Sequence, residues 1–167
     1  MVFNTLYRMV YPFLAVFSRG LGVDLTTLSL AMTNRSLVGM LGAFLATISD
    51  RWGRKAGMLF GIGLFVIGAG VLVIWPSYPG FVIMLILTTL GKYGFDPAMQ
   101  AYLGDRIPYA RRGLAISVTE LGWSLSFFIG IPLVSLLIAR KGWQSPFVWL
   151  ALAGIVLPLL LAEGVFR

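Results

Sequence analysis

The sequence contains neither cysteine nor histidine. Their absence excludes disulfides, metal sites built from these residues, and catalytic triads that use a histidine base. Charged residues are also scarce, at 11% of the chain, whereas a typical soluble domain carries about 25%. Because so few charges cannot cover a water-facing surface, we expect the lipid bilayer to surround this chain. Enzyme chemistry would rest on Asp96, Asp105 and Glu120 alone, so we expect no enzyme, no cofactor and no metal site.

Long apolar runs occupy most of the chain, and 59% of its residues are hydrophobic. A membrane-spanning helix needs about 20 consecutive apolar residues, and the links between the runs are too short to hold a soluble domain. Lipid cannot satisfy backbone polar groups, which favours helices over strands. We therefore predict an all-α, polytopic membrane protein in which residues 1–167 form a single bundle. The six expected spans are residues 4–20, 25–49, 56–75, 80–103, 113–139 and 146–165.

Lysine and arginine gather at one set of helix ends, which predicts the orientation of the bundle. The side that contains the loop at residues 50–55 carries eight of them: Arg8, Arg51, Arg54, Lys55, Arg106, Arg111, Arg112 and Arg167. The opposite side carries three: Arg19, Arg140 and Lys141. We therefore expect an integral plasma (inner) membrane protein with both termini in the cytoplasm. The net charge of +7 forms no basic stripe with interleaved aromatic residues, so we expect no nucleic-acid partner.

The loop between the second and third runs carries four charges within six residues, from Asp50 to Lys55. It resembles the signature G-x-L-A-D-R-x-G-R-K that lies between the second and third helices of the major facilitator superfamily. The matching residues are Asp50, Arg51, Gly53, Arg54 and Lys55, while Ala46 and Ile48 stand at the leading glycine and the leucine. A second stretch resembles the end of the family's fourth helix and the start of its fifth, through Pro97, Ala98, Ala101, Asp105, Pro108, Arg112 and Gly113.

This resemblance covers nearly all of the chain and implies the N-terminal half of a transporter, with six helices arranged as a 3+3 inverted repeat. It implies secondary active transport of a small solute by alternating access. A second six-helix half, absent from this chain, would come from the same gene or from a partner chain. The sequence would then be a fragment or a half-size protein that dimerises. The alternative is a membrane interaction or scaffold module that does not transport.

The resemblance also implies a cytoplasmic gate. Arg54 would pair with Asp105 in the neighbouring loop, and Asp50 with a helix N-terminus in the opposite half. The remaining members of this gate motif are Arg51, Gly53, Lys55 and Arg112. The alternative is that the cations of the loop only set the orientation of the chain.

Ionisable residues inside the predicted spans are costly in a membrane and are therefore candidates for function. Lys92 and Asp96 are spaced i, i+4 on one helix face. At about 1.5 Å per residue, Glu120 reaches a depth similar to that of Asp96. The two carboxylates could share Lys92 as a counter-ion across one cavity, and a close carboxylate pair suits a proton carrier. The alternative is a structural charge network.

Other polar residues lie near the ends of the predicted helices or in the outer half of the membrane. Arg35 is about 22 Å from Asp50 along its helix, and it either binds an anionic group of the substrate or extends outward to the interface. Arg8, with Asn4 and Tyr7, is expected to be an anchor at the cytoplasmic mouth. Glycines at helical spacing predict two contact faces, the first at Gly57 and Gly61 and the second at Gly122, Ser126 and Gly130. Helix breaks are predicted at Pro97 and Pro132.

Overall fold

The computed structural model describes residues 1–42, 44–45 and 51–165, with side chains up to Val156. Asp50, the acidic residue of the predicted gate, lies outside the described residues, and so do Ala46, Ile48 and Arg167. The regular elements are α1 (Val2–Met9), α2 (Leu14–Leu21), α3 (Leu25–Met40), α5 (Arg54–Ile74), α6 (Tyr78–Arg106), α7 (Tyr109–Leu125), the π-helical turn η1 (Ser126–Gly130), α8 (Ile131–Lys141) and α9 (Ser145–Val165). The described part contains no strand, so the all-helical prediction is confirmed.

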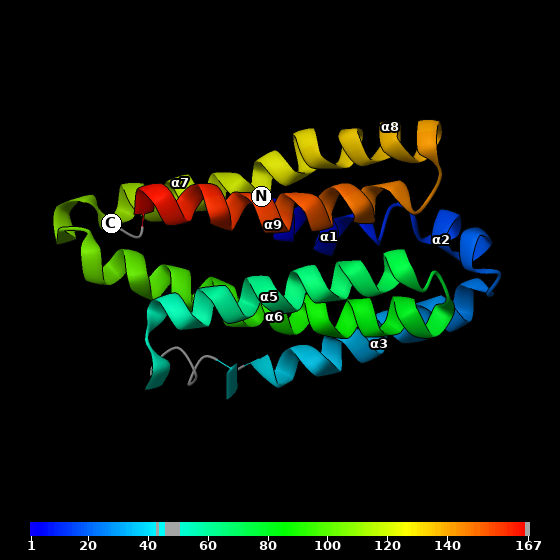
Figure 1. Ribbon diagram of the computed structural model, residues 1–167, viewed down its shortest axis with the longest axis horizontal. Coiled ribbons are helices and arrows are strands. Elements are labelled where there is room, and N and C mark those ends of the chain that lie inside the picture. Colours follow the sequence, from blue (N-terminus) through cyan, green and yellow to red (C-terminus); the bar gives the residue numbers. More distant parts are fainter. Residues whose placement is uncertain (43, 46–50, 166–167) are drawn as a thin grey trace.

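The helices run roughly along the long axis of the molecule (Figure 1). Two helical segments of the described part are long and apolar enough to cross a membrane, namely α5 and the continuous run Tyr109–Lys141. Helices α2 and α3 would supply a third if their 115° bend belongs to one broken span. The count of six spans and the internal repeat therefore stay predictions.

Residues 10–13 interrupt the first predicted span, which is not one helix. Pro12 has no amide hydrogen, and the Tyr11 amide donates to the Arg8 carbonyl at 3.2 Å, in a tighter turn than an α-helix. The carbonyl of Tyr7 consequently loses its usual amide partner. The apolar character of residues 4–20 continues through Pro12 and by itself predicts a continuous span.

Asp24 caps the N-terminus of α3, and its carboxylate accepts a hydrogen bond from the Thr27 amide at 3.2 Å. The Thr27 hydroxyl donates to the same carboxylate. These two hydrogen bonds, the hydroxyl first, hold the pKa of Asp24 below its ordinary value. The charged carboxylate also suits the positive end of the helix dipole.

Helices α5 and α6 pack closest together and form the centre of the bundle (Figure 1). At their crossing, a Cβ atom on Gly61 would lie 2.6 Å from the Gly91 carbonyl oxygen, and one on Gly91 would lie 2.6 Å from the Gly61 carbonyl oxygen. The predicted contact face is confirmed at Gly61, because only glycine allows this backbone approach. The core around it includes Phe65, Met84 and Leu85.

The second glycine face lies against α1. A Cβ atom on Gly130 would lie 2.4 Å from the Thr5 hydroxyl oxygen, and Ser126 is fully buried.

The two positions at which prolines predict helix breaks differ from each other. Helix α6 continues through Pro97, so the break predicted there is wrong. The proline removes one backbone hydrogen bond, and the turns on either side of it remain helical. Before Pro132 the chain forms the π-helical turn η1, but the helical run is continuous from Tyr109 to Lys141, so a local distortion stands where a break was predicted.

Candidate functional site

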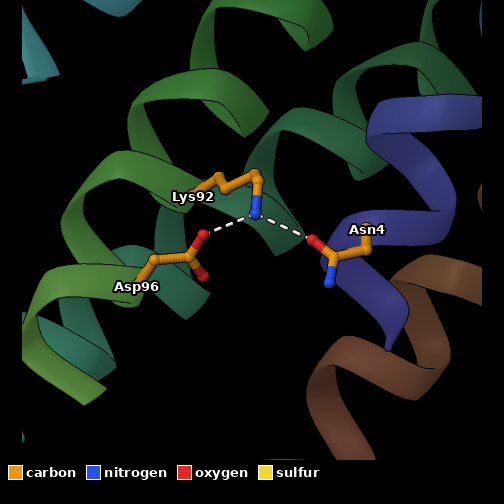
Figure 2. Close-up of polar contacts among 3 residues, drawn as sticks. All are labelled: Asn4, Lys92 and Asp96. Carbon is orange, nitrogen blue, oxygen red and sulfur yellow. Dashed lines mark hydrogen bonds and ion pairs between the residues drawn. The ribbon is translucent and has the colours of Figure 1, made fainter. Parts of the chain in front are cut away.

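Lys92 lies at the centre of a buried polar cluster between α6 and α1. Its ammonium nitrogen is 2.5 Å from Asp96 Oδ2, one turn along α6, and donates to Asn4 Oδ1 on α1 at 2.7 Å. Figure 2 shows the ammonium group between the two acceptors. Lys92 is 6% exposed, so its charge is satisfied by protein groups and not by water.

An aromatic ring from a third helix completes the cluster. The ring of Trp123 on α7 lies 4.6 Å from Lys92 Nζ and 4.6 Å from the guanidinium carbon of Arg8. The Tyr7 ring lies 5.9 Å from Lys92 Nζ. Cation–π attraction at these distances stabilises a desolvated cation. Helices α1, α6 and α7 therefore meet around Lys92.

A cavity of about 240 Å³ lies beside this cluster. It is lined by residues of α1, α6 and α7, among them Phe3, Asn4, Phe95, Asp96, Glu120 and Trp123. The structure thus brings two of the predicted ionisable residues, Asp96 and Glu120, to one cavity. Lys92 pairs with Asp96, whereas Glu120 makes no hydrogen bond or ion pair with any described residue.

Arg35 forms a separate buried site between α3 and the break after α1. It is 2% exposed, and its guanidinium donates to the Tyr7 carbonyl at 3.2 Å and to the Tyr11 hydroxyl at 3.0 Å. The guanidinium carbon lies 3.9 Å from the centre of the Tyr7 ring. Arg35 thus supplies a donor to the carbonyl that the turn at Pro12 frees. Its Nε has no acceptor in the described part of the chain.

Two residues of the predicted gate, Arg54 and Asp105, meet at one end of α5 and α6. Arg54 Nε is 3.3 Å from Asp105 Oδ2, and both side chains are partly exposed to solvent. Gly53, the residue before α5, has φ of 94°, a conformation that favours glycine. Arg112 donates to the Ile107 carbonyl at 3.1 Å. Arg51 and Lys55 are exposed beside them.

Sequence reasoning missed four members of these clusters: Asn4, Tyr7, Tyr11 and Trp123. The sequence predicts Asn4 and Tyr7 at the cytoplasmic mouth, and the structure adds that Asn4 binds Lys92 and the Tyr7 carbonyl binds Arg35. Asn4, Tyr7 and Tyr11 are spaced i, i+3, i+7, and this polar helix face would have pointed to the bundle interior. Trp123 gave a weaker signal, because it lies in the middle of a span and not near the interfaces where tryptophan is common.

Comparison with known proteins agrees with this architecture. Residues 1–166 match the sequence model of the Major Facilitator Superfamily. The chain is 27% identical over 140 residues to an uncharacterized MFS-type transporter, YwfA, of Bacillus subtilis, covering 83% of this chain and 34% of that protein. A second B. subtilis transporter of this type, YbcL, is 27% identical over 137 residues, covering 81% and 35%.

A third relative is a probable quinate permease of Neosartorya fischeri, 31% identical over 134 residues, covering 75% of this chain and 24% of the permease. The chain thus spans about a third of the length of the B. subtilis relatives. The family match extends over almost every residue, including those of the polar clusters and of the charged loop before α5. The chain belongs to the major facilitator superfamily of membrane transporters.

Proposed function

We propose that the chain is the N-terminal half of a secondary active transporter that moves a small solute by alternating access. The observation that carries the proposal is the buried Lys92–Asp96 pair beside a cavity on helices α1, α6 and α7. A charged side chain at the centre of a membrane helix costs about 2.5–3.5 kcal/mol on insertion scales. Such residues mark substrate or ion pathways when they face a cavity.

The solute binds in this cavity, and the Arg54–Asp105 pair closes the cytoplasmic side in one of the two states. Asp50, on the same loop, contributes to this closure through the opposite half. The second half is a six-helix bundle from the same protein or a partner. Only 17% of the most apolar part of Tyr109–Lys141 is buried within the described chain. This exposed apolar surface supports contact with a partner bundle or with lipid.

Proton coupling is the second part of the proposal, and Asp96 and Glu120 are its carriers. Both line the cavity, and they come from different helices. The test is solute uptake into proteoliposomes with and without an imposed pH gradient. Asp96→Asn or Glu120→Gln abolishes the effect of the gradient if the proposal holds. Coupling through this pair is wrong if both variants respond to the gradient like the unsubstituted protein.

Alternating access is testable by cysteine labelling without knowing the solute, because the 167 residues of this chain contain no cysteine and any cysteine elsewhere in the whole protein can be replaced. Thr119 lines the cavity, so Thr119→Cys in the whole protein reports which side the cavity opens to. We expect an impermeant maleimide to label this cysteine from either side of the membrane. Labelling from one side alone, with and without a pH gradient, would instead indicate a non-transporting module. The solute panel for uptake includes quinate, since a relative is named a probable quinate permease.

A further inference from the structure

A second cavity lies between α1, α8 and α9, which pack against one another (Figure 1). Its volume is about 450 Å³, within the range of about 300–1,000 Å³ that is usual for ligand sites. Leucines of α8 and α9 and the ring of Trp149 form much of its walls. Two of the lining side chains, Leu133 and Trp149, are about half exposed, so the cavity is a groove that opens on the surface of the bundle.

Polar groups are nearly absent from the surface of this groove. The Thr5 hydroxyl lies on its α1 side and already donates to the Met1 carbonyl at 3.2 Å. The amino nitrogen of Met1 lies on the side of α7, 3.4 Å from the place of a Cβ atom on Gly122. A polar solute would lose its hydration in the groove without gaining hydrogen bonds. The walls therefore suit a hydrocarbon chain.

Two cations stand at one end of the groove. Arg140 and Lys141 are the last residues of α8, both are exposed, and neither forms an ion pair with any side chain that the structure describes. Lys141 Nζ lies 5.5 Å from the centre of the Trp149 ring, which lines the groove. Tryptophan is common at the level of the lipid headgroups, and basic side chains there attract anionic lipids.

The length of the groove matches one leaflet of a bilayer. Along α8 its lining runs from Leu137 back to Gly130. At about 1.5 Å per residue, these two residues lie roughly 6 Å and roughly 17 Å from Lys141 along the helix. One leaflet supplies half of a hydrocarbon core that is about 30 Å thick. A lipid chain that enters beside Lys141 would therefore end near Gly130, at the middle of the membrane.

We propose that this groove binds one acyl chain of an anionic phospholipid, and that the lipid phosphate lies at Arg140 and Lys141. The apolar walls accept the chain, and the two cations favour a headgroup with a net negative charge. A protein partner fits less well, because the walls offer it almost no hydrogen-bonding group and the cations at the mouth need a counter-ion. The site lies apart from the solute cavity and does not depend on transport.

The test uses two photoreactive lipids, a phosphatidylglycerol and a phosphatidylcholine, each with a diazirine in the middle of the same acyl chain. The whole purified protein is irradiated in vesicles that contain either lipid at the same mole fraction, and the modified residues are identified by mass spectrometry. We expect phosphatidylglycerol to label the groove residues of α8 and α9 at least threefold more than phosphatidylcholine does. Ile67, on the exposed face of α5, is the internal reference and should be labelled equally by both lipids.

Two pairs of variants locate the headgroup and the chain. Lys141→Gln is expected to lower labelling by phosphatidylglycerol toward the level of phosphatidylcholine. Arg111→Gln, its control, removes an exposed cation at the opposite end of the same helical run and should change nothing. Ala153→Phe fills the groove and is expected to reduce labelling of α8 by both lipids at least threefold. Leu152→Phe, at an exposed neighbour outside the lining, should not.

Equal labelling of the groove by the two lipids would overturn the proposal, because the cations would then select no headgroup. An unlabelled groove with a labelled Ile67 would show that protein, such as a second bundle, covers it, and the proposal would again be wrong. If a variant does not fold, the comparison of the two lipids on the unsubstituted protein still decides.

Discussion

At the scale of the residue, two buried cations are stabilised in different ways. Lys92 has a carboxylate one turn away on its own helix. Arg35 has no carboxylate partner in the described chain and relies on a carbonyl, a hydroxyl and the faces of two tyrosine rings. A guanidinium suits this second environment, because it is planar, donates from several nitrogens and stacks on aromatic rings.

Tyr11→Phe tests the environment of Arg35. The variant removes the hydroxyl that accepts from Arg35 and leaves a buried guanidinium N–H without a partner. We expect a loss of about 1–3 kcal/mol in the free energy of unfolding, measured by thermal unfolding in detergent. Tyr109→Phe is the matched control, since Tyr109 is 87% exposed, and it is expected to unfold like the parent protein. Equal stability of the two variants would contradict the assigned role of the Tyr11 hydroxyl.

Individual contacts could be predicted from the sequence only where spacing or family resemblance provided them. The Lys92–Asp96 pair follows from the i, i+4 spacing on one helix. The Arg54–Asp105 pair joins residues 51 positions apart, and it was expected from the resemblance alone. Asn4 is 88 positions from Lys92, and no local rule relates two residues on helices whose packing is unknown.

At the scale of the element, the crossing of α5 and α6 depends on glycine. Gly61→Ala is expected to destabilise the protein by about 1–3 kcal/mol, because the added methyl group would lie 2.6 Å from a backbone oxygen of α6. Gly63→Ala, two residues further along α5, serves as the control, because a Cβ atom there would meet no atom within 4 Å. We expect it to be neutral or slightly stabilising, since alanine favours helix. Thermal unfolding of both variants checks the contrast, and similar melting temperatures would refute it.

The cap of α3 predicts a pH dependence. The hydrogen bonds from Thr27 lower the pKa of Asp24 in the folded protein, so the charged cap stabilises the fold above the ordinary pKa of 3.8. This contribution is lost as the pH falls through the lower, folded-state pKa. Asp24→Asn keeps an uncharged cap that does not titrate.

The measurement is the melting temperature of Asp24→Asn and of the parent protein between about pH 6 and pH 2. The parent is expected to be the more stable above about pH 4, and its advantage should shrink at lower pH. A difference that stays constant over this range would show that Asp24 titrates alike in the folded and unfolded states.

The elements themselves were predictable to different degrees. The third expected span, residues 56–75, corresponds closely to α5, Arg54–Ile74, because a charged glycine turn and Pro76 bound an unbroken apolar run. The first span is interrupted at Pro12, while α6 continues through Pro97. A proline removes one hydrogen bond in either place, and the surrounding packing, which the sequence does not display, decides whether the helix breaks.

At the scale of the whole molecule, the uneven distribution of cations predicts an orientation that can be measured directly. Because the chain has no cysteine, single cysteines can be introduced at exposed positions of opposite ends: Gln144 in the link before α9 and Arg111 at the start of α7. In intact cells, with a cysteine-free background, we expect an impermeant maleimide to label Gln144→Cys. Arg111→Cys should be labelled only after the membrane is permeabilised. The reverse pattern would invert the proposed topology.

Fold class and family were within reach of the sequence, since composition alone excludes a soluble domain and the charged loop resembles a family signature. The position of the cavity could not be predicted from the sequence. The spacing predicts that Asp96 and Glu120 lie at one depth, but only the packing of α1 against α6 and α7 determines that Lys92 turns toward Asn4 and that Asp96 and Glu120 line one cavity.

The placement of the two buried cations has a consequence for biogenesis. Lys92 and Asp96 are on one helix, so they can neutralise each other as soon as α6 forms, before any other helix has packed. Arg35 has no such partner within α3, and the groups that receive it, Tyr7 and Tyr11, belong to an earlier part of the chain. Synthesis from the N-terminus therefore delivers the acceptors before the cation that needs them. The order of the helices along the chain is thus also an order in which each buried cation finds its partners already made.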